Sequence, residues 1–327
     1  MKINKSIQCC ICGSNQSEIK FNSLSFILEE CIECQMLWKN YKTELNKEAV
    51  QEIQDKVYSD LGRLKIPMMK KMSKDRFDLL YQHKKNGRLL EIGCATGEFL
   101  DIATEEGFES TGLEASKLYS DYAKSRGLRI INGYLEDLKR EETFDVISMF
   151  HLFEHIEEPN NFLDNLSKHL DRNGVLMFVV PNQGSFTNKF FGYHHPVYQQ
   201  TDHLFFYNQK TLSSILEKNG FKILSIQSLE YPHHPFTSLS SYLAKKYKRI
   251  TERGKKEGKR VSEKTVVKSD VNEKSNNISL KPYLRILADK IPYLLGTIFY
   301  PILKIYGNIL ERRISGHELI IFATKAK

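Results

Sequence analysis

The sequence predicts an α/β fold of the doubly wound, Rossmann-like class, in which helices cover both faces of a mainly parallel sheet. From Arg88 onward, short apolar segments alternate with helical ones, which is typical of this fold class. The segment from Arg88 to Ile92 also runs directly into a glycine-rich turn that opens a helix. In addition, two Cys-x2-Cys pairs near the N terminus predict a small domain ahead of the sheet.

The predicted strands follow one another along most of the chain. They cover Arg88–Ile92, Ser110–Glu114, Leu128–Asn132, Phe144–Met149, Val175–Val180, Phe221–Leu229 and His317–Thr324. Helices are expected at Phe99–Gly107 and Thr211–Gly220, because each has helical spacing and ends on a glycine. The dipeptide Asn173-Gly174 is expected to turn the chain into the fifth strand.

Carboxylates lie at the ends of the first two predicted strands, at Glu91 and Glu114. The glycines of the turn let the backbone bend sharply and approach a ligand closely. The turn does not fit the G-x-G-x-x-G dinucleotide fingerprint, because Ala95 and Glu98 replace two of its glycines. Glu98 would also repel a pyrophosphate at the start of the helix. The turn therefore favours a nucleoside ligand that carries positive charge.

The run from Arg88 to Gly97 resembles motif I of class I S-adenosylmethionine-dependent methyltransferases. Further segments resemble one large group of these enzymes that acts mainly on small molecules and sugars, namely Asp145-Val-Ile, His151-x-x-Glu-His155, Asn173-Gly174 and Pro181-Asn182. The resemblance spans about Arg88 to Ser228. It implies a seven-stranded sheet whose last strand is antiparallel, and S-adenosylmethionine as the cofactor.

The same resemblance implies which residues bind the cofactor. They are Glu91, Gly93, Cys94, Ala95, Gly97, Glu114, Leu135, Glu136, Phe150 and His151. In the family, the loop that holds Leu135 and Glu136 lines the adenine, and the positions of Phe150 and His151 face the methionine end beside the reacting methyl group. Tyr134 departs from the family pattern, because many relatives have aspartate at that position.

The N-terminal segment has the cysteine spacing of a four-thiolate zinc site, formed by Cys9, Cys12, Cys31 and Cys34. Cys10 could replace Cys9, although its single-residue spacing to Cys12 makes a poorer pair. Four thiolates leave no open coordination position, so we expect structural Zn²⁺ that stabilises a ribbon with little apolar core of its own. The chain has no signal peptide and Cys94 is left over, so disulfides are not expected and a reducing, cytoplasmic location is.

Four histidines are candidate catalytic bases, because the unperturbed pKa of histidine suits proton transfer near neutral pH. They are His151, His155, His195 and His203. His151 is best placed, directly after the fourth strand, where it would either contact a ligand or move the proton. His155 could instead fix its loop by hydrogen bonds. His203 could instead be a structural anchor at the base of the pocket.

The segment from Gln183 to Tyr207 is the predicted substrate region, because it follows the fifth strand at the carboxyl edge of the sheet and is rich in aromatic residues. Rings with polar tips suit a sugar or aromatic acceptor. The predicted pocket residues are Tyr193, His194, His195 and Tyr198. The phenylalanines at 186, 190 and 191 are at helical spacing, and packing of a short lid helix explains them.

We predict five regions along the 327 residues. Residues 1–41 form the zinc ribbon, 42–87 a helical linker that caps the pocket, and 88–230 the cofactor-binding core. Residues 231–316 form a helical insertion that includes a basic mobile loop at 249–279. Residues 317–327 return to the sheet as its last strand.

The positive charge of the chain is concentrated in this insertion. Residues 245–268 contain 11 Lys and Arg and three Glu, a local net charge of +8 that equals the formal charge of the whole chain. Nucleic-acid-binding proteins usually spread such charge over a face, so a solvated loop is favoured over an RNA or lipid contact. The apolar run at 291–303 is too short to cross a bilayer, although residues 249–310 could provide a peripheral membrane contact.

The sequence therefore predicts a cytoplasmic methyltransferase of a small molecule, a sugar or glycan precursor, with transfer to oxygen favoured over carbon or nitrogen. The ribbon keeps carbon open, because sugar C-methyltransferases also begin with one. One alternative is an RNA base methyltransferase, and it is disfavoured because Pro181-Asn182 replaces the Asn-Pro-Pro-Tyr type of motif. A second alternative is a noncatalytic scaffold, which the acidic strand ends and glycines argue against. No pattern in the sequence predicts the oligomeric state.

Overall fold

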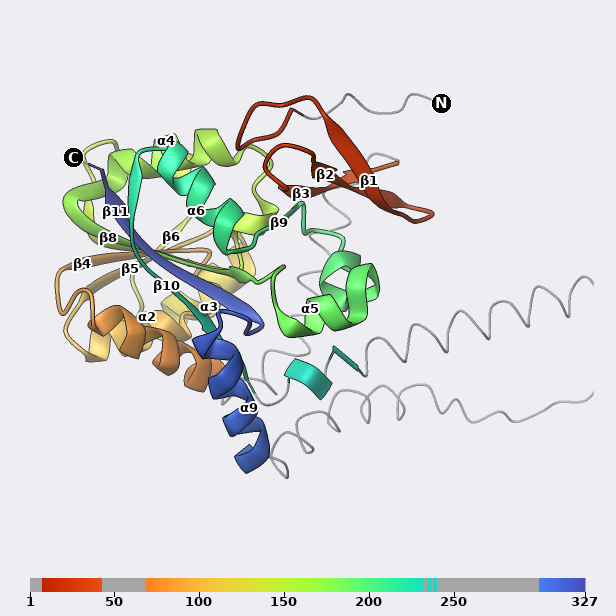
Figure 1. Ribbon diagram of the computed structural model, residues 1–327. Coiled ribbons are helices and arrows are strands. Elements are labelled where there is room, and N and C mark those ends of the chain that lie inside the picture. The colour runs from red at the N-terminus through yellow and green to blue at the C-terminus, as the bar shows by residue number, and fades with distance from the viewer. Residues whose placement is uncertain (1–7, 43–68, 232–233, 237, 240–299, 327) are drawn as a thin grey trace, which may run out of the picture.

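The computed structural model describes residues 8–42, 69–231, 234–236, 238–239 and 300–326 (Figure 1). The predicted linker is therefore described only at residue 42 and over residues 69–87, where 69–81 are helical. The basic loop at 249–279 and most of the apolar run at 291–303 lie outside the described residues. Among the helices that are described, none is both long and apolar enough to span a membrane.

The larger of two sheets has seven strands in the order β10-β11-β8-β7-β4-β5-β6. Its strands are β4 (Arg88–Ile92), β5 (Glu109–Glu114), β6 (Ile130–Asn132), β7 (Phe144–Phe150), β8 (Leu170–Pro181), β10 (Phe221–Leu229) and β11 (Glu318–Lys325). The pairs among β4 to β8 are parallel, whereas β11 is antiparallel to both β8 and β10. The predicted doubly wound, seven-stranded sheet with an antiparallel last strand is confirmed.

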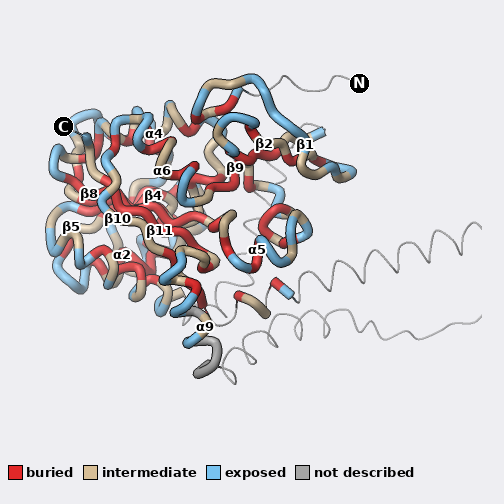
Figure 2. Tube along the Cα trace, viewed as in Figure 1, coloured by how far each residue is buried: buried red, intermediate tan, exposed pale blue. Residues whose placement is uncertain are grey.

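Helices cover both faces of this sheet (Figure 1). On one face lie α4 (Pro159–His169) and α6 (Gln209–Lys218), and on the other lie the helix at 69–81, α2 (Glu98–Glu105) and α3 (Lys117–Ser125). A further helix, α9 (Tyr300–Arg312), lies beside β10. Both faces of the central strands are therefore buried (Figure 2).

The central strand β8 shows why its sequence is a nearly continuous apolar run. Leu176, Phe178 and Val180 pack into the hydrophobic cluster under α4 and α6. Met177 and Val179 pack into the cluster on the opposite face. Successive side chains of a strand point to opposite faces, so a strand that is covered on both sides must be apolar at every position.

The smaller sheet contains the ribbon strands β1 (Ser17–Asn22), β2 (Phe26–Cys31) and β3 (Leu37–Tyr41), all antiparallel. Its fourth strand, β9 (Phe205–Phe206), comes from the segment predicted to line the substrate pocket. Leu37 pairs with Phe206 and Trp38 with Phe205. The ribbon is thus joined to the larger domain by main-chain hydrogen bonds as well as by side-chain packing.

Short helices connect β7, β8 and β9 to the rest of the chain. They are η1 (Leu135–Asp137), η2 (Phe153–His155), α5 (Phe186–Phe191), η3 (Gly192–His194) and η4 (Pro196–Gln199). The largest difference from the predicted strands is in β8, which begins at Leu170 and runs through Asn173-Gly174 instead of starting after it. Leu170 pairs with Phe144, and the carbonyl of Gly174 accepts the Thr324 hydroxyl at 2.8 Å, so both edges hold this stretch extended.

Candidate functional site

The glycine turn after β4 has the backbone conformation that the sequence predicts. Gly97 has a φ of +85° at the start of α2, and a Cβ added there would lie 2.4 Å from Cδ1 of Leu128. Gly93 also has a positive φ, of +72°, and its N–H donates to the carbonyl of Leu113 at 2.8 Å. The turn is therefore tight and is bonded to the end of the neighbouring strand β5.

The carboxylate of Glu114 fixes the tip of β5 against this turn. Its Oε2 accepts the N–H of Ala95 and its Oε1 accepts the N–H of Ser116, both at 2.8 Å. Because two backbone donors hold it, the carboxylate has a defined position at the carboxyl edge of the sheet. At this place its carboxylate oxygens are suited to accept the hydroxyls of a ribose.

Glu91 is buried near the end of β4, with only 4% of its surface exposed. Burial, and then the charge of Glu98, raise its pKa well above the usual value, while Arg76 opposes this rise. Its Oε2 has no hydrogen-bond partner among the described residues. Buried polar atoms are rarely left unpaired, so this oxygen fits a ligand that brings a donor or a positive charge.

Arg76 and Glu318 are site residues that the sequence analysis missed. A guanidinium nitrogen of Arg76 lies 2.8 Å from Oε1 of Glu318, and the guanidinium also covers the ring of Phe150, 4.9 Å from its centroid. The same Glu318 oxygen lies 3.0 Å from Nε2 of His151. Only local features could have indicated these two residues. Arg76 precedes the buried Phe77 of a helix, and Glu318 is the one acid within the apolar strand β11.

His151 lies directly after β7, where the sequence predicts it, with a positive φ of 53°. Burial lowers the pKa of His151, but the neighbouring carboxylates of Glu154 and Glu318 outweigh burial and raise it to about 9. The Nδ1 atom lies 3.5 Å from Oε1 of Glu154. The imidazole is therefore protonated at neutral pH, and its Nε2 donates a hydrogen bond to Glu318.

The structure brings three of the four candidate histidines together. The rings of His155 and His203 have centroids 4.8 Å apart, and Glu154 lies between them and His151. Burial, and then the charge of His155, hold the pKa of His203 well below its usual value. His203 is therefore a neutral imidazole in the folded protein.

His195 lies away from this group, in a second cluster with His317, whose ring centroid is 5.7 Å away. Its Nδ1 accepts the N–H of Val197 at 3.2 Å, so Nε2 carries the proton and donates to the Ser238 hydroxyl at 3.1 Å. Both nitrogens of His195 are thus engaged inside the protein. Its catalytic and substrate-binding roles stay predictions.

The other predicted substrate residues lie against the ribbon. Tyr198 is buried and packs on Phe206 of β9, with ring centroids 4.9 Å apart. The rings of Tyr193 and His194 lie 6.1 and 5.6 Å from that of Phe21 in β1. The aromatic residues of this segment therefore pack against the ribbon, a contact that the sequence did not predict.

The remaining predicted cofactor residues differ in exposure. Leu135 is in the hydrophobic core, whereas its neighbour Glu136 in η1 is exposed. The thiol of Cys94 is buried under the turn, and burial raises its pKa above the usual range. A Cβ on Gly112 would lie 2.5 Å from this sulfur, so the thiol occupies the space that the missing side chain leaves.

The four predicted metal ligands of the ribbon lie together. The sulfurs of Cys9, Cys12, Cys31 and Cys34 are all within 4.8 Å of one another. Cys10 is outside this group, and burial raises the pKa of its thiol to about 12. The donor set and its compactness fit a tetrahedral zinc ion.

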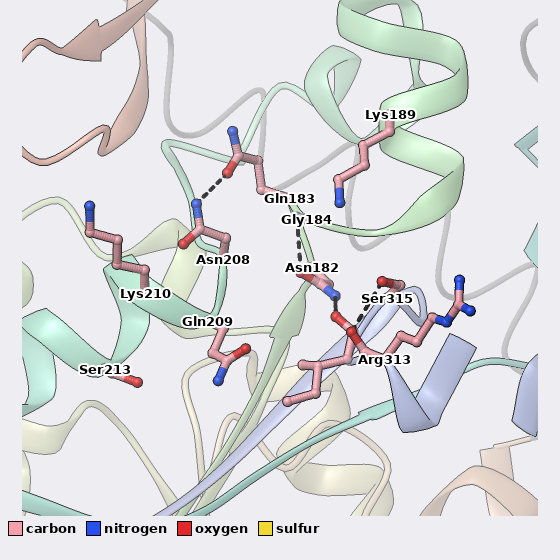
Figure 3. A pocket seen from close by; sticks show the side chains of 11 residues that line it. Asn182, Gln183, Gly184, Lys189, Asn208, Gln209, Lys210, Ser213, Arg313 and Ser315 are labelled. Atoms are coloured by element: carbon pink, nitrogen blue, oxygen red, sulfur yellow. Dashed lines mark hydrogen bonds between the residues drawn. The ribbon is translucent and has the colours of Figure 1, made fainter. Parts of the chain in front are cut away.

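A cavity of about 630 Å³ opens beyond the end of β8, between α5, α6 and the segment that follows α9 (Figure 3). Its walls carry the cationic side chains of Lys189, Lys210 and Arg313. None of the predicted site residues lines it. We therefore centre the candidate site on the ends of β4, β5 and β7.

Comparisons with known proteins identify the kind of domain that holds this site. Residues 68–226 match a family model described as a methyltransferase domain. Ubiquinone biosynthesis O-methyltransferase of Rickettsia canadensis (strain McKiel) is 28% identical over 101 residues, which cover 29% of this chain and 43% of that protein. An uncharacterized methyltransferase of Alkaliphilus oremlandii is 32% identical over 102 residues, which cover 30% of this chain and 47% of that protein.

The chain thus spans less than half the length of these two curated relatives. Among solved structures, a SAM-dependent methyltransferase from Archaeoglobus fulgidus is similar with a TM-score of 0.47 and 20% sequence identity. That alignment covers 78% of this chain and 94% of the other.

Proposed function

Residues 68–226 are a class I S-adenosylmethionine-dependent methyltransferase domain, and from this premise we propose that the protein methylates a small-molecule acceptor. We propose a sugar or glycan precursor as the acceptor and a hydroxyl oxygen as the methylated atom. The observation that carries the proposal is the pair of carboxylates, Glu91 and Glu114, held at neighbouring strand ends around the glycine turn.

The described residues fit the cofactor. Glu114 would accept hydrogen bonds from the ribose hydroxyls, and the unpartnered oxygen of Glu91 would attract the positively charged end. When bound, S-adenosylmethionine supplies a methyl group on a cationic sulfur, which a nucleophile displaces in line. The protein contributes mainly by holding two reactants at attack distance, because this chemistry needs no covalent enzyme intermediate.

His151 has a defined part in this mechanism. Its Nε2 is held by Glu318, whereas its Nδ1, which lies 3.5 Å from Oε1 of Glu154, would donate to an acceptor oxygen and orient it. Removal of the acceptor proton requires a neutral imidazole, and His203 is one as long as it binds no metal ion. His155 and His195 remain the other candidate bases.

Two observations support a small-molecule acceptor and a hydroxyl oxygen as the methylated atom. The motifs from Asp145 to Asn182 resemble those of methyltransferases that act on small molecules and sugars. Several curated relatives are described as ubiquinone biosynthesis O-methyltransferases, and those proteins support oxygen as the accepting atom. We propose a cytoplasmic location, and peripheral membrane contact through residues 249–310 stays the less favoured alternative to a solvated loop.

We also propose that Cys9, Cys12, Cys31 and Cys34 bind one structural Zn²⁺. Four sulfurs within 4.8 Å of one another support this, and they leave no coordination position for a substrate. The ion would stabilise the ribbon, whose β2 and β3 pack on the larger domain. It would take no part in methyl transfer.

Titration calorimetry with S-adenosylmethionine, followed by transfer of a labelled methyl group to nucleotide-linked sugars, tests the function. We expect cofactor binding and a methylated sugar product. Transfer to an RNA fragment instead would replace the proposal with the RNA alternative. Absence of cofactor binding by the folded protein would indicate a scaffold.

A further inference from the structure

A second cluster of metal-ligating side chains lies outside the ribbon, where η2 meets the segment before β9. We propose that Glu154, His155 and His203 bind one divalent metal ion. Each offers one ligand atom, and these atoms all lie within 4.8 Å of one another. This separation lets one ion contact all three with small side-chain movements.

The carboxylate of Glu154 is the first observation that points to an ion. Its side chain is only 1% exposed, and neither oxygen has a hydrogen-bond partner among the described residues. Two imidazole nitrogens lie near Oε1, His151 Nδ1 at 3.5 Å and His155 Nε2 at 3.9 Å, and both distances are longer than hydrogen bonds. A buried carboxylate with two unused oxygens is costly unless it is paired or coordinates a metal.

His203 is the second observation. It is 5% exposed, and its Nδ1 has no hydrogen-bond partner among the residues that the structure describes. Its ring faces that of His155 edge-on, with centroids 4.8 Å apart. Glu154 and His203 are thus two buried ligand groups that lie close together, each with an atom that lacks a hydrogen-bond partner.

His155 has the hydrogen bond that is typical of a metal-bound histidine. Its Nδ1 lies 2.8 Å from the backbone carbonyl of Asp202, and a carbonyl can only accept, so Nδ1 carries the proton. The lone pair is then on Nε2, the nitrogen that lies near Glu154. Such outer hydrogen bonds fix the tautomer and orientation of ligating histidines.

The backbone holds the cluster in place. Glu154 and His155 are consecutive in η2, and the carbonyl of Glu154 accepts the N–H of Leu204 at 2.9 Å, directly beside His203. The carbonyl of Leu204 in turn accepts the N–H of Lys39 in β3 at 2.8 Å. The site therefore lies in the larger domain, next to its junction with the ribbon.

The donor set selects the kind of ion. Two imidazoles and one carboxylate suit a divalent transition metal and differ from the four thiolates of the ribbon. Three protein ligands leave coordination positions open, and these would bind oxygen atoms of the acceptor. This last role rests on the proposed function, whereas the metal site itself does not.

Titration of the full-length protein with Mn²⁺, followed by loss of the free-ion signal in electron paramagnetic resonance, tests the site. One equivalent of Zn²⁺ per chain is added first, which the four thiolates bind in preference to the second cluster, so that Mn²⁺, which prefers oxygen and nitrogen ligands, reports on the second cluster alone. We expect one Mn²⁺ per chain, and at least about tenfold weaker binding by E154Q and by H203Q. As a matched control, H83Q removes a histidine that bonds Ser225 elsewhere in the fold, and should bind Mn²⁺ as the wild type does.

Circular dichroism shows whether each variant folds, and Mn²⁺ should raise the Tm of the wild type but not of H203Q. Wild-type protein that leaves the Mn²⁺ signal unchanged, or E154Q that binds as tightly as the wild type, would overturn the site. Calorimetry with S-adenosylmethionine on the same samples separates the two proposals. Cofactor binding without Mn²⁺ binding defeats only the metal site, and the reverse result defeats only the proposed function.

Discussion

The backbone N–H of Ala95 donates a 2.8 Å hydrogen bond to Oε2 of Glu114, so the turn after one strand is bonded to the tip of the next. Ala95 has a φ of +45° there, in a conformation that few residues other than glycine adopt. One carboxylate thus orients the glycine turn and also presents lone pairs at the edge of the sheet. Loop conformation and ligand binding therefore depend on the same side chain.

We expect E114Q to weaken S-adenosylmethionine binding by about tenfold, because an amide keeps the shape but loses the charge and one of the two acceptor oxygens. Titration calorimetry measures the change. E109Q is the matched control, since Glu109 begins the same strand with an exposed side chain. Equal affinities for E114Q and the wild type would contradict the ribose role of Glu114.

G112A should destabilise the protein by about 1 to 3 kcal/mol through overpacking. The new methyl carbon would lie 2.5 Å from Sγ of Cys94 and 2.6 Å from the side chains of Ile130 and Leu100. Urea unfolding measures the free energy of unfolding. If the clash is the cause, adding C94A to G112A should recover part of the loss, and strictly additive effects would argue against it.

C31S should remove the zinc and lower the Tm, because Cys31 is fully buried and its sulfur lies 3.4 Å from that of Cys12. Elemental analysis of the purified protein gives the zinc content. C10S should keep one Zn²⁺ per chain, because the thiol of Cys10 is outside the cluster. Loss of zinc from C10S but not from C9S would show that the shifted cysteine pairing is the correct one.

The folded protein should lose stability as pH falls below about 6.5, because two histidines are buried in neutral form. Burial lowers the pKa of His234 to about 4 and that of His317 to about 3, and their rings are 4.2 Å apart. The charges of Glu230 and Glu318 oppose this for His317 and are outweighed. The unfolded chain binds protons near pH 6.5 and the folded chain does not, so protonation favours unfolding between these values.

Each of these histidines should cost about 1 kcal/mol of stability at a pH one unit below 6.5. Thermal melts of the wild type and of H317N across this range measure the effect. The variant should lose less stability on acidification than the wild type, whereas H194N, which changes an exposed histidine, should match the wild type. Parallel pH profiles for H317N and the wild type would show that His317 does not drive the loss.

The sequence by itself determined the sheet, the glycine turn, the acidic strand ends and the grouping of the four cysteines. These features depend on short-range rules, such as strand periodicity, the conformational freedom of glycine and the spacing of metal ligands. The sequence predicts a start of β8 that is too late in the chain. The pairing of Leu170 with Phe144 and the hydrogen bond from Thr324 to Gly174 extend this strand through a dipeptide that usually forms turns.

Only the tertiary structure decided that Phe205 and Phe206 add a strand to the ribbon, and that Tyr198 packs beneath it. Likewise, Arg76 and Glu318 meet although they are 242 positions apart in the chain. The local sequence around an aromatic segment or a single charged residue does not predict which distant residue it will contact. Its contacts are fixed when distant surfaces are buried together, because only then must each buried polar group find a partner.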